Sequence, residues 1–492
     1  MSKRVELIND EIPLPDTSIQ HIQSFLISKQ AAQTTILSKS WYRAWLTRPD
    51  LDFRFSDFRT THEFWSFTLH ADSYVDMVEN STLTDRLVIS AMKMDPFVFT
   101  LELNSQIMSY YNLSYEVLAS KTLTKLSLKC CSVDRKAGGE VKCSKLECLR
   151  LSRVTIEGDM FWDLISGGSS IKEMVLSQCL CFFDVNRDYP KSSPCIKFRE
   201  HNYVSIPSLL SLCEFHKLRS LVIENMDIKV SFFDNFSKKF PILKDFSAKY
   251  CKVEKGLIRI CSPSLECVTF GLREGVLRAK FDVPSLRKFS FSGSRLPSIS
   301  FQKANRELWE VDISISCRRH PYYSWFLDLK RFLTKLRLSR ISLFLKFRCN
   351  VENEHHGGDL GNIRSLTKPA EVENLMVHEE SSICNAFLDC LFWSCRPKFV
   401  SHYWFPESCC DWNVNNNVLK TLCEKLVAGG VSESCPLPNI NVASLPGLVD
   451  VNAERFEESV AEWEPIPLAT LLDPSITPEK KEKIRFRLKW ER

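Results

Sequence analysis

A short apolar motif recurs along the middle of the chain and constrains its fold more than any other feature. The motif has the form apolar-x-x-apolar-x-apolar, and its successive copies start 23, 25, 47, 25, 22, 21, 22 and 25 residues apart. Because one such unit cannot bury its apolar side alone, the units must stack on one another. The copies start at Leu123, Leu146, Ile171, Leu218, Leu243, Leu265, Leu286, Leu308 and Leu333.

This spacing is typical of leucine-rich repeats, whose units are about 20–29 residues long. It predicts an α/β fold: a curved solenoid over residues 123–400 with a parallel sheet on one face. The gap of 47 residues fits either one degenerate unit or an insertion around residues 186–205. Two other residue types recur at fixed distances from the repeat starts and support the period. Proline stands two residues before three of the starts (Pro241, Pro263, Pro284), and cysteine stands eight residues after three of them (Cys131, Cys179, Cys251).

Three short amphipathic helices are predicted before the repeats. The first starts at Leu14-Pro15-Asp16, since proline suits the first turn of a helix and an acid suits its positive end. A second is expected over residues 30–36, and Ser38 can cap a third, which ends before Pro49. About forty residues are near the limit for independent folding, so their apolar faces need a partner or the next domain.

This ordered set of residues resembles the plant-type F-box, and with the repeats the chain resembles plant F-box/leucine-rich-repeat proteins. The matching pieces are Leu14-Pro15-Asp16, Phe25-Leu26, residues 36–41 (Ile-Leu-Ser-Lys-Ser-Trp) and residues 49–53 (Pro-Asp-Leu-Asp-Phe). The resemblance implies docking on a Skp-type adaptor and, through it, on a cullin ubiquitin ligase. The contact residues that it implies are Leu14, Pro15, Ile19, Ile22, Leu26, Ile36, Leu37 and Trp41.

The resemblance therefore implies a substrate-recognition subunit of an SCF-type (Skp–cullin–F-box) ubiquitin ligase, with the repeats binding the target protein. Three positions differ from the family pattern: Gln23, Ser40 and the segment between the first two helices. They motivate an alternative, a leucine-rich-repeat interaction scaffold with a degenerate F-box and no ligase role.

The boundaries follow from these assignments: an F-box at 1–55, an irregular linker or first degenerate repeats at 56–122, the solenoid at 123–400, and a C-terminal cap and tail at 401–492. Within 56–122 we expect a repeat-like segment at 85–89 and a helix near 104–119. Residues 372–377 fit one more strand, and 388–399 fit a cap of the array. Residues 484–490 alternate like a strand, although Thr477-Pro478-Glu479 resembles a helix start.

Two tail segments carry opposite charge and are expected to pair. Residues 453–464 hold five acids and one base, a net charge of −4. Residues 479–492 hold seven bases and three acids, a net charge of +4.

The outward positions of the repeat strands form the predicted contact surface. At the third, fifth and seventh positions of the units we count seven basic and five acidic side chains, a sum of +2 with both signs interspersed. A groove that follows nucleic-acid phosphates needs a more one-sided face, so a protein or peptide partner is favoured and nucleic acid is not expected. The candidate target-binding residues are Lys125, Arg150, Asp245, Lys288, Asp312 and Arg337.

No chemistry-bearing motif competes with this interpretation. The sequence has no GxxxxGK[ST], GxGxxG, GxSxG or HExxH, so we expect a non-catalytic adaptor without a cofactor. His355, His356 and Asp359 can ligate a metal, but they lie in a polar glycine-containing segment that favours a loop. The 20 cysteines form no CxxC, and no apolar signal or membrane-length run occurs. This predicts an intracellular chain, in cytoplasm or nucleus, with reduced thiols.

Overall fold

The computed structural model of the chain divides into two compact units, Met1–Met226 and Asp227–Arg492. Each unit is described by itself. The structure describes residues 14–26, 28–46, 50–54, 66–71, 81–103, 111–133, 140–167, 170–182, 203–302, 309–317, 323–336, 339–347, 368–379, 385–401, 445, 447–457, 462–467 and 484–491.

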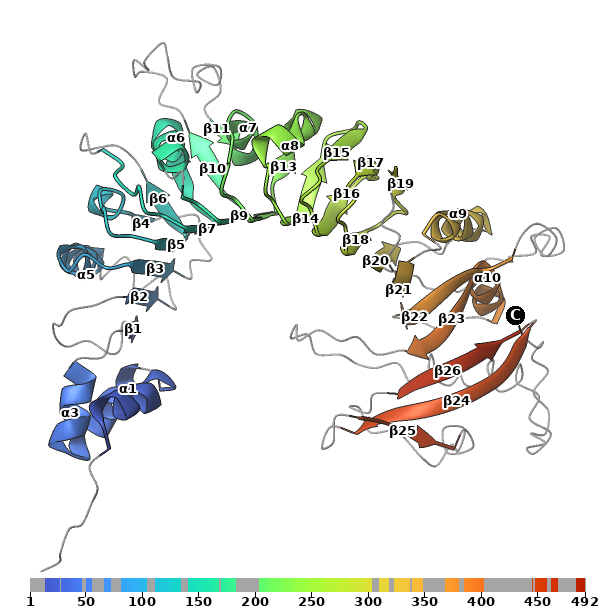
Figure 1. The fold of residues 1–492 in the computed structure, drawn as a ribbon, viewed down its shortest axis with the longest axis horizontal. Helices are drawn as coiled ribbons and strands as arrows, with labels where there is room; N and C mark the ends of the chain where they lie inside the picture. Colours follow the sequence, from blue (N-terminus) through green and yellow to red (C-terminus); the bar gives the residue numbers. More distant parts are fainter. Residues whose placement is uncertain are drawn as a thin grey trace, which may run out of the picture. The chain divides into compact units, whose positions relative to one another are not determined.

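The first unit begins with helices and continues as strands that alternate with short return segments (Figure 1). Its helices are α1 (Asp16–Ser24), α2 (Ser28–Gln33), η1 (Thr34–Ile36), α3 (Lys39–Leu46), α5 (Ser81–Lys93), η3 (Tyr115–Val117), α6 (Gly158–Gly167) and α7 (Ile206–Leu210). Its main strands are β1 (Asp50–Arg54), β2 (Ser66–Ala71), β3 (Val98–Leu103), β5 (Lys125–Lys129), β7 (Cys148–Ser152), β9 (Glu173–Ser177) and β12 (Ser220–Glu224).

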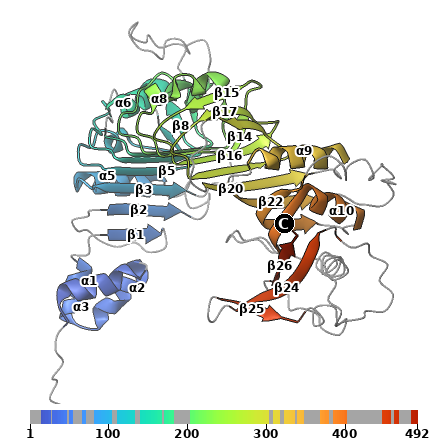
Figure 2. The same ribbon diagram turned by 45° about the vertical axis from the view of Figure 1, so that its right-hand side comes forward.

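These main strands pair in sequence order and all in parallel. Figure 2 shows β1, β2, β3 and β5 stacked one after another. Since β9 pairs directly with β12, the described residues between these strands, 178–182 and 203–219, add no strand to the main sheet. The long gap between repeat starts therefore corresponds to one step of the main sheet, and most of the segment expected to be an insertion lies outside the described residues. A second sheet follows the order β11-β10-β8-β6-β4, from β4 (Tyr111–Asn112), β6 (Cys131–Val133), β8 (Thr155–Glu157), β10 (Leu180–Phe182) and β11 (Tyr203–Ser205).

The second unit continues the same architecture with longer strands. Its main sheet contains β14 (Asp245–Val253), β16 (Cys267–Glu274), β18 (Lys288–Gly293), β20 (Trp309–Cys317), β21 (Ser339–Phe347), β22 (Ala370–Glu379) and β23 (Cys395–Ser401), paired in parallel in that order. A small parallel sheet contains β15 (Ile258–Cys261), β17 (Arg278–Asp282) and β19 (Ser298–Phe301). The other described elements before residue 402 are β13 (Asp227–Ile228), η5 (Val230–Phe233), α8 (Phe236–Lys239), α9 (Tyr323–Thr334) and α10 (Asn385–Ser394).

The expected pairing of the charged tail segments is confirmed. Strand β26 (Ile484–Trp490) is antiparallel to β23 and to β24 (Leu448–Glu457), and β24 is antiparallel to β25 (Glu462–Ile466). Glu454 of β24 lies 2.6 Å from both Arg485 and Arg487 of β26. The opposite charges of the two segments therefore meet inside one antiparallel sheet, and 484–490 is a strand rather than a helix.

The repeat strands alternate between buried apolar and outward polar residues, and many of them end in a sharp turn. Five residues that stand seven after a repeat start adopt a left-handed backbone with φ between 51° and 59°: Cys130, Arg153, Gln178, Asn225 and Tyr250. The turn directs the following side chain into the coil, which suits a small group. Accordingly Cys131, Cys179 and Cys251 are buried and their thiols donate to backbone carbonyls at 3.2–3.4 Å. The cysteine register is thus confirmed.

Phenylalanine fills the interior of the second unit's first repeats. Phe246 lies 5.5–5.6 Å from the rings of Phe236 and Phe270, in edge-to-face contacts, and the ring of Phe281 is tilted at 6.2 Å from Phe270. All four side chains are buried. Contacts between aromatic rings therefore link one repeat to the next, which gives many of the 33 Phe of the chain a structural role.

Two expectations about local structure were wrong. No α-helix covers the described part of 104–119, which contains β4 and η3, whereas residues 85–89, expected to be repeat-like, lie in helix α5 between the paired strands β2 and β3. The last repeat was placed too early: Leu333 belongs to α9, and the strand apolar positions are Ile341 and Leu343, which pair with Val311 and Ile313. The error arose because Leu-x-x-Leu fits both a helix and the start of a repeat. Lys335 therefore follows the helix, and Arg337 lies outside the described residues.

Strand 372–377 is confirmed as part of β22, whereas 388–399 forms helix α10 and strand β23, a further repeat rather than a cap. The candidate metal ligands His355, His356 and Asp359 lie outside the described residues.

Candidate functional site

Helices α1 to α3 enclose a very small core. Among the described side chains of these helices, the buried ones are Ile19, Gln23, Ala31 and Ala44. Gln23 is polar yet fully buried, and its amide nitrogen donates to Thr34 Oγ1 at 2.8 Å and to the Trp41 carbonyl at 3.3 Å. This side chain therefore links η1 to α3 from inside, at a position where the plant F-box pattern has an aliphatic residue.

Pro15 and Ser38 cap the N-terminal ends of α1 and α3. The Pro15 carbonyl accepts from the backbone N–H of Ser18 and Ile19 at 2.9 and 3.1 Å, which places Pro15 at the N-cap, one residue before the predicted position. Ser38 Oγ accepts the Trp41 N–H at 3.4 Å and caps α3 as predicted.

Most large apolar side chains of this segment point to solvent instead of into the core. Ile36 is 86% exposed, Phe25 77% and Leu37 62%. We call the exposed set the apolar patch, and burying it would remove a substantial apolar area from water. Its members are Leu14, Ile22, Phe25, Ile36, Leu37 and Tyr42.

The structure separates the residues that sequence resemblance grouped together. Leu14, Pro15, Ile22, Ile36 and Leu37 are exposed, and Leu26 and Trp41 are half-buried. Ile19 is only 1% exposed and supports the helices from within.

Phe25 and Tyr42 belong to the patch but were not among the predicted contact residues. Phe25 was quoted only as part of the motif, and its edge-to-face contact with His21, at 5.0 Å between ring centroids, leaves most of the ring exposed. An aromatic residue directly after the capped end of a short amphipathic helix was the available signal.

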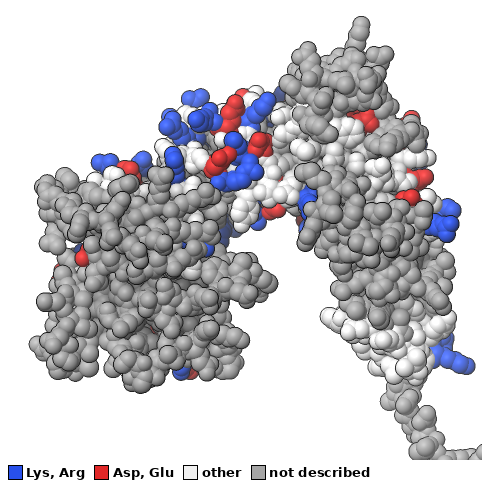
Figure 3. Space-filling model, turned by 180° about the vertical axis from the view of Figure 1, so that it is seen from behind, with Lys and Arg blue, Asp and Glu red and all other residues white. Residues whose placement is uncertain are grey.

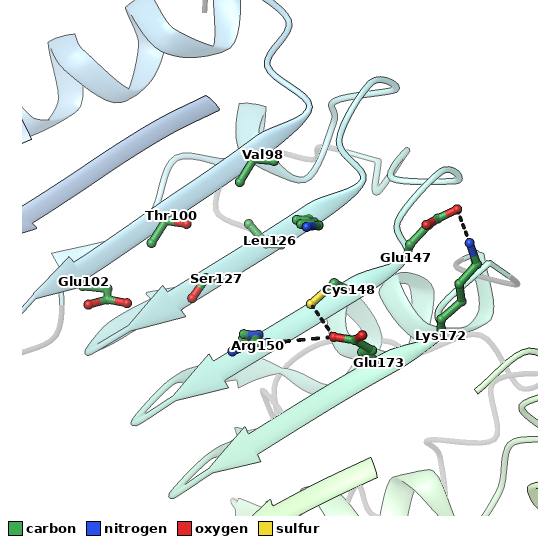
Figure 4. A pocket seen from close by; sticks show the side chains of 11 residues that line it. Val98, Thr100, Glu102, Leu126, Ser127, Glu147, Cys148, Arg150, Lys172 and Glu173 are labelled. Atoms are coloured by element: carbon green, nitrogen blue, oxygen red, sulfur yellow. Dashed lines mark hydrogen bonds and ion pairs between the residues drawn. The ribbon is translucent and has the colours of Figure 1, made fainter. Parts of the chain in front are cut away.

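The sheet of the first unit offers a second candidate surface. Outward side chains of β3, β5, β7 and β9 line a shallow hollow of about 390 Å³ (Figure 4). Two of the predicted target-binding residues, Lys125 and Arg150, line it. Arg150 lies 3.8 Å from Glu173, and Lys172 and Glu147 form an ion pair at 2.7 Å at the rim. The hollow therefore combines apolar lining residues with side chains of both signs of charge.

The sheet of the second unit holds three more of the predicted residues. Lys288 Nζ lies 2.9 Å from Asp312 and 3.7 Å from Glu310, so the two carboxylates enclose one ammonium group. The hydrogen bond to Asp312 and the charge of both carboxylates raise the pKa of Lys288. Asp245 is exposed two strands away, at the same register level as Lys288. Figure 3 shows basic and acidic side chains interspersed where the described repeats are visible, in agreement with the mixed charge predicted.

Comparison with known proteins identifies the relatives of the chain. It is 29% identical to an F-box/LRR-repeat protein of Arabidopsis thaliana over 265 residues, which cover 45% of this chain and 47% of the relative. A second such Arabidopsis protein is 29% identical over 263 residues, 47% of this chain and 46% of the relative. An Arabidopsis F-box/FBD/LRR-repeat protein is 43% identical over 67 residues, 13% of this chain and 15% of the relative. No family model matches the chain.

This chain is related to plant F-box/LRR proteins. It spans about half the length of these curated relatives. Their names describe an F-box and leucine-rich repeats, and the parallel sheet of stacked units is the expected fold of the repeat portion.

In the described part of the chain, the requirements of a metal site and of a membrane helix are not met. Among the described residues there is no cluster of three or more His, Cys, Asp or Glu side chains that can hold a metal ion. Within the same ranges no helix is long and apolar enough to cross a membrane. Cys143 and Cys179 are free thiols in the interior of the repeats. Burial raises the pKa of each thiol to about 12.

Proposed function

We propose that the chain is a substrate-recognition subunit of an SCF-type ubiquitin ligase. Helices α1 to α3 form the F-box module and dock a Skp-type adaptor, which links the chain to a cullin. The repeat sheets hold the target protein. The chain itself performs no chemistry in this proposal.

The exposed apolar patch is the observation that carries the proposal. Six large apolar side chains are exposed within residues 14–42, while the described interior of these helices holds only a few small or short side chains. Exposed apolar surface of this density on so small a module is typical of a protein interface. Hot-spot side chains of such interfaces are large, rigid and buried on binding, as Phe25, Ile36 and Tyr42 would be.

The deviation at Gln23 is compatible with the fold of the module. The amide nitrogen of Gln23 donates two hydrogen bonds inside the module, while its Oε1 is buried without a hydrogen-bond partner among the described residues. The scaffold with a degenerate F-box therefore stays the alternative that the adaptor-binding test decides.

The mechanism is proximity. A target held on the repeat sheet keeps its lysines near the ubiquitin-charged enzyme, which raises their effective concentration without a catalytic group in this chain. The mixed charges of Lys125, Arg150, Lys288 and Asp312 suit a polar protein surface, since charge pairs across an interface add specificity more than affinity.

The first test is capture of a purified Skp-type adaptor by the full chain. Leu14→Ala/Pro15→Ala removes two exposed residues at the start of α1 and is expected to abolish capture. The control is Leu257→Ala/Val276→Ala, which removes two exposed apolar side chains from turns of the repeats and is expected to capture normally. If the wild-type chain captures no adaptor, the alternative of a repeat scaffold without a ligase role replaces the proposal.

A further inference from the structure

The small sheet β15–β17–β19 has one buried apolar face and one exposed polar face. Its inward residues are apolar, and Ile258, Ala279 and Ile299 are buried side by side in register. Its outward residues are exposed and polar: Arg259 and Cys261 on β15, Arg278 and Lys280 on β17, and Ser298 and Ser300 on β19. We call this outward face the cationic strip.

Its three cations are close to one another. Arg259 is in register with Lys280 on the neighbouring strand, and Arg278 is two residues before Lys280 on the same strand. Neighbouring strands are about 4.8 Å apart, and residues two apart on a strand are about 6.6 Å apart. Ser298 and Ser300 pair with Arg278 and Lys280 and add hydroxyl donors beside them.

These cations lack the carboxylate partners that other cations of the same repeats have. Lys244 pairs with Glu266 at 2.7 Å and Lys252 with Glu274 at 3.0 Å, and Arg273 lies 3.4 Å from Asp227. Within the described ranges neither Arg259, Arg278 nor Lys280 forms an ion pair. The cations of the main-sheet edge are thus neutralised locally, and those of the cationic strip are not.

One acid shares this face. Asp282 follows Lys280 by two residues and is half-buried, and its Oδ2 accepts from the Cys261 thiol at 3.9 Å. It is in register with Cys261 at the end of the strip, beyond the three cations. Three cations and one acid leave the strip with a local charge of +2.

The first unit has a different surface at the corresponding place. The second sheet there presents Asn112, Ser132, Thr155 and Leu180 among its solvent-accessible residues, and none of these four is charged. The repeat fold therefore does not require cations at this location, and the positive charge is a property of these particular units.

We propose that the cationic strip binds an extended acidic segment of a protein partner. In an extended peptide, side chains at positions i and i+2 point to the same side about 6.6 Å apart, which matches the separation of Arg278 and Lys280. Guanidinium groups bind carboxylates in a bidentate fork, so aligned Glu or Asp residues suit this arrangement. The surface is separate from the outward face of the main sheet.

Nucleic acid fits this surface less well. Proteins that bind nucleic acid through phosphates use about 6–10 phosphate contacts and a one-sided basic surface. The strip supplies three cations, and the nearby Lys244 and Lys252 are already paired with carboxylates. A short acidic segment needs only two or three cations.

The inference does not depend on adaptor docking, because its test contains no adaptor. The probe is a fluorescent peptide of alternating Glu and Thr, titrated with the full chain and followed by fluorescence anisotropy. The test variant is Arg259→Gln/Arg278→Gln/Lys280→Gln. All three side chains are exposed, so the thermal transition should not move.

The matched control is Lys244→Gln/Lys252→Gln/Arg273→Gln, which removes the same charge from the same repeats but only from paired side chains. The strip variant is expected to bind the peptide about tenfold more weakly than wild type, and the control variant within about twofold, with wild-type affinity falling as salt rises. Equal loss in both triple variants would overturn the inference. Tighter binding of a single-stranded oligonucleotide than of the peptide would overturn it in favour of nucleic acid.

Discussion

Glu454 gives the most quantitative prediction about stability. Its side chain is 8% exposed, accepts a hydrogen bond from Arg485 Nε at 2.6 Å and forms an ion pair with Arg487 at 2.6 Å. Arg485 is itself mostly buried, at 22% exposed, and lies over the rings of Trp463 and Phe399 at 4.0 and 4.5 Å. Glu454→Gln keeps the shape and one acceptor oxygen but removes the charge.

The expected loss follows from the contacts. A hydrogen bond to a charged group contributes about 1.5–3 kcal/mol. The variant weakens the hydrogen bond from Arg485, loses the ion pair with Arg487 and leaves two guanidinium groups without a compensating carboxylate. Breaking a fully buried pair costs about 3–5 kcal/mol. The Arg487 side chain, however, is 53% exposed and remains hydrated. We therefore expect β24–β26 to lose about 2–3 kcal/mol of local stability.

The assay is amide hydrogen exchange of β24 and β26, because a local opening is not resolved by a global melt of stacked repeats. A loss of about 2–3 kcal/mol accelerates exchange about 30- to 150-fold. The control is Glu373→Gln, which breaks an exposed pair with Lys398 at 3.1 Å on the neighbouring strands β22 and β23. An exposed pair contributes little, so this variant should change exchange less than about fivefold. Equal effects of the two variants would refute the assigned role of Glu454.

Three further predictions concern the repeats. At pH 8 a maleimide should label exposed Cys261 and spare buried Cys179. Burial raises the pKa of the Cys179 thiol to about 12, so this thiol stays protonated well below that pH. Equal labelling of the two cysteines, measured by mass spectrometry, would contradict this prediction. Tyr250 has φ 52° and is 64% exposed. Tyr250→Gly should therefore raise the free energy of unfolding by about 0.5–1 kcal/mol, while Asn225→Gly should change it less in the same thermal denaturation. Phe246→Ala should cost about 3–5 kcal/mol, seen as faster hydrogen exchange in its own and adjacent repeats, and uniform acceleration along the chain would contradict the stacked-unit account.

The parts of the fold that follow a strict period could be predicted from sequence. The repeat starts from Leu123 to Leu308 lead into strands of the main sheet, because a buried apolar residue must occupy alternate positions of each strand. The Cys131 register also held, since the left-handed turn before it directs the next side chain into the coil, where it is buried. The tail pairing followed from opposite charge alone.

The errors occurred where two periods overlap. Leu333 and Leu336 fit both a helix face and a repeat motif, and only the packing of α9 distinguishes the two. The sequence also did not show which apolar residues of the N-terminal helices are buried. Apolar spacing groups Ile19 with Ile22, yet Ile19 is buried and Ile22 is exposed. The cationic strip depends on pairing between strands of successive repeats, which the sequence of one unit does not show.

The central claim is that the apolar patch docks an adaptor, and an affinity measurement tests it most directly. Calorimetric titration of a purified Skp-type adaptor into the full chain would be compared for wild type, Ile36→Asp/Leu37→Asp and Leu257→Asp/Val276→Asp. All four side chains are exposed, so neither variant should unfold the chain. We predict that the patch variant binds at least about 100-fold more weakly and that the repeat variant binds as wild type. Unchanged affinity of the patch variant would contradict the account.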